Sequence, residues 1–170
     1  PASTSSLARR QTAERRAKEL VEAGELGRVV GLEGNFSTPG GMRQNPNTWR
    51  YDRRRCPAAP MMQLGVHLLD FFIHLTGPVD SVQAYMKHTA MPGENDDAVV
   101  INFETESGVL GVLSTYYVTP HVWSFRILGT GGVLDGSQGE LVLRRDGHEE
   151  TETFDRDDSI QEEIDEFGRC

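Results

Sequence analysis

Four polar residues interrupt an otherwise apolar stretch of the sequence, MMQLGVHLLDFFIHLT, at residues 61–76. They are Gln63, His67, Asp70 and His74, at successive spacings of four, three and four residues. On an α-helix this spacing places them within an arc of about 60°, and apolar side chains cover the rest of the surface. Because buried polar groups destabilise a protein unless they are paired, these four residues either have partners in the fold or face a cleft where chemistry occurs.

His67 is the candidate acid/base of this group, because an imidazole with a pKa of about 6.5 can take a proton from a substrate hydroxyl at neutral pH. The alternative is a core histidine that is bonded to a backbone carbonyl. Asp70 can orient an imidazole or form a structural ion pair, and the structural role is favoured. His74 is expected to complement the helix dipole from the last turn.

The same residues form the pattern H-x2-D-x3-H, which can in principle hold a divalent metal ion. All of these ligands come from one helix, and the sequence has no cysteine or further histidine clustered nearby. We therefore expect no metal site.

Size and charge narrow the function. The chain has 170 residues, of which 37% are hydrophobic, and this predicts one domain with its own core. A net charge of −9 and a pI of about 5.0 disfavour nucleic-acid binding. No apolar run is long enough to cross a membrane. The two cysteines, Cys56 and Cys170, form no recognisable disulfide framework, so we expect a soluble cytoplasmic protein.

The periodicity predicts a helix over residues 7–23, with ion pairs Glu14–Lys18 and Lys18–Glu22, and then a strand over 28–37. Residues 38–60 form a long loop that carries Trp49 and Arg50. The apolar stretch is expected to be a buried helix. Five alternating segments follow, at 81–89, 96–105, 109–118, 122–130 and 139–146, and a last helix is expected at 157–168.

These strands are expected to pair mostly antiparallel, because short glycine-containing connections such as Glu106-Ser107-Gly108 favour hairpins. Alternation of apolar and polar residues favours a sheet with helices on one face only. The fold class is therefore α+β, and the open face of the sheet is a candidate interaction surface. The glycine cluster at 129–139 does not fit G-x-G-x-x-G and is expected to be a turn region.

Several segments together resemble a known family, and the most specific is G-V-H-x-x-D at residues 65–70, followed by L-x-G-x-V at 75–79. The TWRYD loop lies just upstream, and RRAKELVEAGELGRVVGLEGNFS, GVLGVLSTYY and RILGTGGVL are supportive. The chain resembles the C-terminal domain of the Gfo/Idh/MocA oxidoreductases, the group of glucose-fructose oxidoreductase and inositol dehydrogenase. The resemblance covers nearly the whole chain.

The resemblance implies a two-domain enzyme in which a Rossmann domain binds NAD or NADP. Residues 1–170 are then the single substrate-binding and oligomerisation domain, without the Rossmann domain, and this fragment alone is expected to be inactive. The open sheet face is expected to form a homo-oligomer, a dimer or a tetramer. The family's Glu-Lys-Pro motif and glycine-rich nucleotide loop do not occur in this sequence.

By the same resemblance, His67 matches the acid/base histidine of the family. Gln63 stands where the family commonly has an aspartate, and an amide binds a hydroxyl but cannot relay a proton. The implied reaction is hydride transfer between the nicotinamide and a secondary alcohol of a sugar, polyol or similar small molecule, with Gln63, Trp49 and Arg50 positioning substrate hydroxyls. The alternative is a non-catalytic scaffold that dimerises or binds a partner through its sheet.

Overall fold

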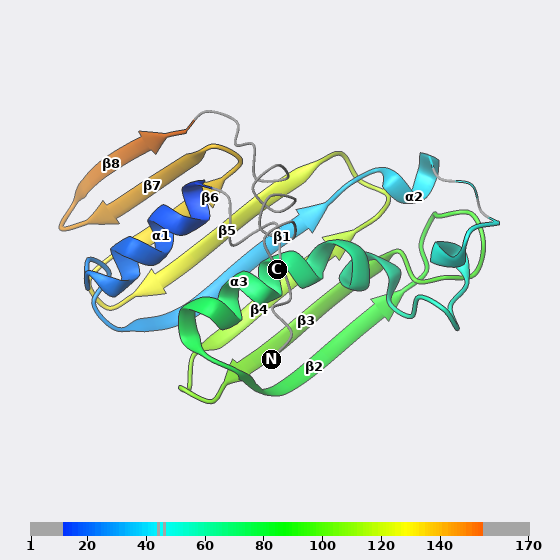
Figure 1. Cartoon of the computed structure of the whole chain (residues 1–170), viewed down its shortest axis with the longest axis horizontal. Coiled ribbons are helices and arrows are strands. Elements are labelled where there is room, and N and C mark those ends of the chain that lie inside the picture. The colour runs from blue at the N-terminus through cyan, green and yellow to red at the C-terminus, as the bar shows by residue number, and fades with distance from the viewer. Residues whose placement is uncertain (1–11, 44, 46, 155–170) are drawn as a thin grey trace, which may run out of the picture.

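A computed structural model of the chain describes residues 12–43, 45 and 47–154. Within that range, eight strands form one sheet in the order β2-β3-β4-β1-β5-β6-β7-β8 (Figure 1). The strands are β1 (Val29–Ser37), β2 (Val79–Lys87), β3 (Ala98–Thr105), β4 (Leu110–Tyr116), β5 (Val122–Gly129), β6 (Val133–Ser137), β7 (Glu140–Arg145) and β8 (His148–Thr153). The helices are α1 (Thr12–Glu22), α2 (Gly40–Arg43) and α3 (Val66–Thr76), with a 3₁₀ turn at Trp49–Tyr51 and a π-helical turn at Met61–Gly65.

Neighbouring strands of this sheet run antiparallel, except that β1 and β4 are parallel. Helices α1 and α3 lie on the same face (Figure 1), with α1 packed against β6 and β7, and α3 against β1. The predicted α+β fold, a mostly antiparallel open sheet with helices on one face, is therefore confirmed. Since β1 and β4 are parallel, their carboxyl ends meet at one end of the sheet.

The main core lies between α3 and the centre of the sheet. Leu68, Phe71 and Phe72 of α3 are buried, and the Phe71 ring meets that of Phe125 edge-on with centroids 5.0 Å apart. Gly34 of β1 permits this close packing, because a Cβ atom there would lie 3.0 Å from Cζ of Phe72. Aromatic rings thus fix the distance between α3 and β1.

Of the two ion pairs predicted on α1, the structure contains one. Lys18 pairs with Glu22 at 2.9 Å, as expected. The predicted Glu14–Lys18 pair is wrong, because Glu14 is buried and its Oε1 accepts a hydrogen bond of 2.9 Å from Nε1 of Trp123. Helical spacing alone cannot show that the glutamate lies on the core side. Arg16 instead links α1 to β8 through Glu152, with Nε to Oε2 at 3.0 Å.

The sequence analysis did not predict strands β6 and β8. The glycine-rich segment 129–139, predicted as a turn region, contains β6, because the ring of Phe125 on β5 lies over Gly136 and supplies the apolar cover that the glycine lacks. Strand β8 has the sequence HEETET, which contains no apolar residue, so it shows no alternation of apolar and polar residues. Residues 7–11, the tail helix at 157–168 and Cys170 lie outside the described residues.

The helix expected over the apolar stretch forms at residues 66–76, but the expectation that it is buried apart from its polar residues is wrong. The stretch forms a π-helical turn followed by α3, and only one side of it is buried. On the opposite side Met62 and Val66 are exposed at 59% and 45%. In the part of the chain that the structure describes, no helix is long and apolar enough to cross a membrane.

A buried carboxylate organises the loop between β2 and β3. Oδ1 of Asp97 accepts hydrogen bonds from the backbone N–H and the hydroxyl of Thr89, at 2.9 and 2.7 Å. Its Oδ2 accepts from the backbone N–H groups of Ala90 and Met91, at 2.7 and 2.6 Å. Burial by itself raises the pKa of Asp97, but the four hydrogen bonds outweigh it and lower the pKa below its usual value.

We expect Asp97→Asn to lower the free energy of unfolding by about 1–3 kcal/mol at pH 7, because an amide cannot accept all four hydrogen bonds. Since the folded-state pKa is lowered, the contribution of Asp97 is present above the ordinary pKa and is lost as the pH falls through the folded-state pKa. Urea unfolding at pH 7 and at successively lower pH measures both effects. Glu94→Gln, an exposed change in the same loop, is the control, and an Asp97→Asn effect independent of pH would contradict this account.

Candidate functional site

The predicted acid/base lies where the carboxyl ends of β1 and β4 meet the start of α3. His67 is the second residue of α3 and is half-buried. Its ring packs against Phe36 near the end of β1, with centroids 6.2 Å apart and the planes inclined at 47°. A half-buried imidazole at a strand end can both reach a bound molecule and be held by packing, as an acid/base requires.

Phe36 gathers further rings at this place. It meets His121 with ring centroids 6.0 Å apart and Trp123 with centroids 4.6 Å apart, both edge-on. His121 is exposed and lies in the connection between β4 and β5. Sequence reasoning missed His121, because it has no motif of its own and reaches the site only through the antiparallel pairing of β1 with β5, which sets Phe36 opposite Trp123.

Gln63 lies in the π-helical turn, in which the N–H of Val66 bonds to the carbonyl oxygen of Met61, five residues earlier. Such turns occur frequently at functional sites. The prediction that the four polar residues lie within an arc of about 60° assumed an α-helix throughout. It holds for His67, Asp70 and His74, which lie on α3. The π-helical turn changes the angle between Gln63 and His67. Asp70 is half-buried on α3, and His74 is exposed in its last turn.

The amide of Gln63 is oriented by a cysteine. Nε2 of Gln63 donates a hydrogen bond of 3.3 Å to Sγ of Cys56, which is buried and forms no disulfide. This hydrogen bond uses one N–H of the amide and leaves its carbonyl oxygen able to accept a hydrogen bond from another group. Gln63 is thereby suited to accept a hydrogen bond from a hydroxyl group.

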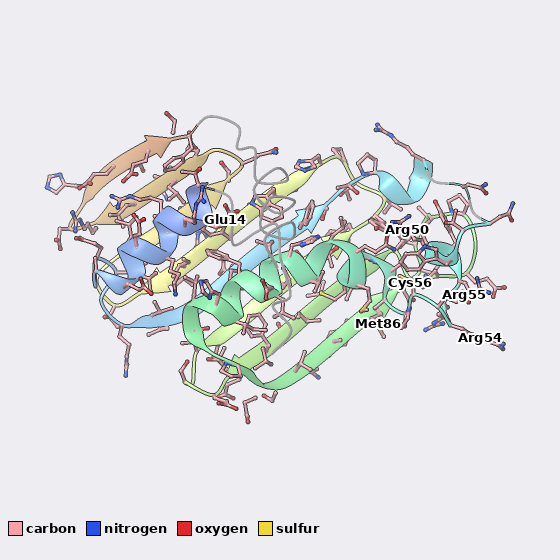
Figure 2. The ribbon with its side chains drawn as sticks, in the orientation of Figure 1. Glu14, Arg50, Arg54, Arg55, Cys56 and Met86 are labelled. Carbon is pink, nitrogen blue, oxygen red and sulfur yellow. The ribbon has the colours of Figure 1, made fainter. Side chains whose placement is uncertain are left out.

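Trp49 and Arg50 lie together on the 3₁₀ turn, and both are exposed. The guanidinium carbon of Arg50 lies 5.0 Å from the centroid of the Trp49 ring, within the range of a cation–π contact. This pair therefore presents a flat aromatic ring and a positive charge to solvent beside the loop that carries Cys56. Figure 2 shows Arg50 and Cys56 on this loop, beyond the first turn of α3.

A buried asparagine holds this loop at two points. Nδ2 of Asn95 donates to the backbone carbonyls of Arg50 and Cys56, both at 2.9 Å. The loop also has a small core of its own, formed by Tyr51, Cys56, Ala59, Met91 and Tyr117. Burial raises the pKa of the Tyr117 hydroxyl, and the nearby charge of Arg50 opposes that shift. Residues 47–60 of the predicted loop are thus held by hydrogen bonds and by a small core, which their composition did not indicate.

An imidazole and an oriented amide thus lie on the first turns of α3, and an aromatic–cation pair lies on the neighbouring loop that carries Cys56. These groups can move a proton and bind hydroxyl groups. In the described ranges, histidine, cysteine, aspartate and glutamate side chains form no group of three or more that could hold a metal ion.

Comparisons with known proteins extend these observations. A protein described as an NADPH-dependent oxidoreductase from Desulfitobacterium hafniense is 27% identical, with a TM-score of 0.86 over 95% of this chain and 52% of that one. An oxidoreductase from Thermotoga maritima is 26% identical, with a TM-score of 0.78 over 96% of this chain and 49% of its own. Levoglucosan dehydrogenase, in complex with NADH and levoglucosan, has the same fold at 20% identity, with a TM-score of 0.77 over 86% of this chain and 45% of its own.

The chain thus spans about half the length of these proteins. No curated protein sequence matches it. The model of the GFO/IDH/MocA C-terminal domain matches residues 15–135, which is more than half of the chain. The domain described here therefore belongs to the GFO/IDH/MocA family, in which it corresponds to the C-terminal domain.

Proposed function

We propose that this chain is the substrate domain of an NAD- or NADP-dependent dehydrogenase that acts on a secondary alcohol of a sugar, a polyol or a related small molecule. The observation that carries this proposal is the position of His67, half-buried at the start of α3 against Phe36, with the oriented amide of Gln63 one turn before it. The structural relatives described as oxidoreductases support the same reaction class.

The nicotinamide cofactor accepts or donates the hydride when it is bound. The described residues offer no Rossmann-type cradle for its phosphates, because the glycine cluster at 129–139 connects strands and forms β6 instead of opening a helix. The cofactor would therefore be held mainly by a domain outside this chain. The choice between NAD and NADP belongs to that domain too.

The residues of this chain have separate roles in the proposal. His67 takes the proton from the substrate hydroxyl, or returns it in the reverse direction. The carbonyl oxygen of Gln63 accepts a hydrogen bond from a neighbouring hydroxyl. Trp49 and Arg50 contact the substrate from the 3₁₀ turn, and Asp70 has a structural or orienting role on α3.

A partner for the open sheet face is part of the proposal. On this face Leu110 and Val112 are exposed at 61% and 43%, beside a depression of about 570 Å³ that Ser114, Ser124 and Asp135 help to line. A second copy of the chain on this face would form a homo-oligomer. The alternative function, a non-catalytic scaffold, would use the same surface without any chemistry at His67.

In the full-length protein, we expect His67→Ala to lower kcat/KM by about 10²–10⁴, the range for loss of a general acid/base. Dehydrogenase assays against a panel of sugars and polyols, with NAD and with NADP, measure this. His148→Ala on the exposed edge strand β8 is the matched control and should leave the rate unchanged. Unchanged turnover in a correctly folded His67→Ala protein would exclude the acid/base role. If the wild-type protein oxidises no compound in the panel, the non-catalytic scaffold function is favoured.

Gln63→Ala should lower kcat/KM by about 3- to 10-fold, because it removes one net hydrogen bond to a substrate hydroxyl. A deoxy substrate that lacks the bonded hydroxyl should show no further loss with this variant. Measuring both proteins on matched hydroxy and deoxy substrates gives the coupling between side chain and hydroxyl. Equal losses on both substrates would assign Gln63 a structural role instead.

Val112→Lys should weaken association through the open face, because it places a charge in a surface that would be buried between copies. Sedimentation equilibrium of the full-length protein gives the mass. Glu94→Lys, which changes an exposed loop residue, is the control and should leave the mass unchanged. The same mass for Val112→Lys and the wild type would place the oligomer contact elsewhere.

A further inference from the structure

Strand β2 is an edge strand with unusual surface properties. Among the residues that the structure describes it pairs only with β3, and Figure 1 shows it along the outer border of the sheet. All of its residues from Asp80 to Lys87 are exposed, and Val82, Tyr85 and Met86 are exposed at 63%, 66% and 50%. Soluble proteins usually protect long edge strands with charges, prolines, bulges or covering elements, because unpaired backbone groups there bind other strands.

The opposite edge of the sheet has this protection. Strand β8 carries Glu149, Glu150 and Glu152 within six residues, and all of its residues but one are exposed. In contrast, the central part of β2, residues 81–86, has the sequence SVQAYM and contains no charge and no proline. These glutamates are paired with arginines: Glu149 with Arg144, Glu150 with Arg145 and Glu152 with Arg16. The sheet therefore has one edge strand built of polar and charged residues and one whose centre is uncharged.

The backbone of β2 is already directed for such pairing. The carbonyl oxygen of Lys87 accepts a hydrogen bond of 3.0 Å from the backbone N–H of Asp97, so Lys87 directs its backbone groups toward β3. Backbone groups alternate in direction along a strand of an antiparallel ladder. The N–H and C=O groups of Val82, Ala84 and Met86 consequently point away from the sheet.

We infer that two copies of this chain associate through their β2 strands, which pair antiparallel about a two-fold axis at Ala84. In this register Val82 of one copy lies opposite Met86 of the other, and Ala84 lies opposite its own equivalent. These residues share the face of Phe103, Ile101 and Val99 on β3, which are buried. The pairing therefore continues the apolar layer of the core from one copy into the next.

Charge and symmetry favour this occupant over an arbitrary strand. Asp80 lies at one end of β2, and Lys87 and His88 lie at the other. Antiparallel self-pairing brings the acidic end of one copy to the basic end of the other, and it does so twice. A two-fold contact of this kind uses the β2 edge of both copies, so the association closes as a dimer instead of a filament.

This interface differs from the open face and does not depend on the reaction. Its register can be tested by cross-linking Ala84→Cys in the full-length protein with Cys170→Ser. In a hydrogen-bonded antiparallel pair the Cα atoms are about 5.5 Å apart, within the range of about 4.4–6.8 Å for a disulfide. We expect a dimer on a non-reducing gel that reductant abolishes. Gln83→Cys is the matched control, because its two copies would be diagonal, about 7–8 Å apart, and should cross-link poorly.

Val82→Lys gives a second readout. It should halve the mass in sedimentation, also in the presence of Val112→Lys, while the unfolding temperature stays within a few degrees of the wild type. Thr151→Lys, an exposed change on β8, should leave the mass unchanged. Any of three results would overturn the inference. Ala84→Cys could fail to cross-link, as it would with another segment over β2, or Gln83→Cys could cross-link equally well. The third result is an unchanged mass for Val82→Lys.

Discussion

The parallel pairing of β1 with β4 is the constraint on which the site depends. It places the carboxyl ends of both strands at the same end of the sheet, beside the first turn of α3. Phe36 of β1 can therefore contact the ring of His67, although 31 positions separate them in the sequence. Gly34, two residues before Phe36, lets Phe72 pack close to the strand and so fixes the height of α3 above it. The position of the imidazole thus follows from core packing.

A second layer of order comes from buried polar side chains outside the sheet. Asn95 donates hydrogen bonds to the backbone of the loop at Arg50 and Cys56. Asp97 accepts hydrogen bonds from the backbone of the segment that follows β2. Both side chains are fully buried, so their hydrogen bonds are difficult to replace by water. Gln63 receives its orientation at the end of this chain of contacts, through the sulfur of Cys56. Precision in the candidate site therefore depends on residues that do not face it.

Sequence patterns predicted the elements that bury apolar side chains on one side. Alternation located β3, β4, β5 and β7, and the family resemblance agreed with the observed sheet. The misses share a physical cause, since β6 depends on the Phe125 ring to cover Gly136, and Glu14 is buried because Trp123 provides a donor. His121 and Asn95 reach their positions through tertiary contacts as well. Partners distant in the chain leave no local periodic signal.

The π-helical turn before α3 also has an evolutionary consequence. It contains one residue more than an α-helical turn, whereas the body of α3 is anchored by Leu68, Phe71 and Phe72. Deleting one residue from Met61–Gly65 would restore α-helical hydrogen bonding and rotate the preceding residues by about 100° around the helix axis. His67 would keep its place while the amide of Gln63 left the site. A single-codon deletion would thus change which side chains lie beside His67 while the body of α3 and the imidazole kept their places.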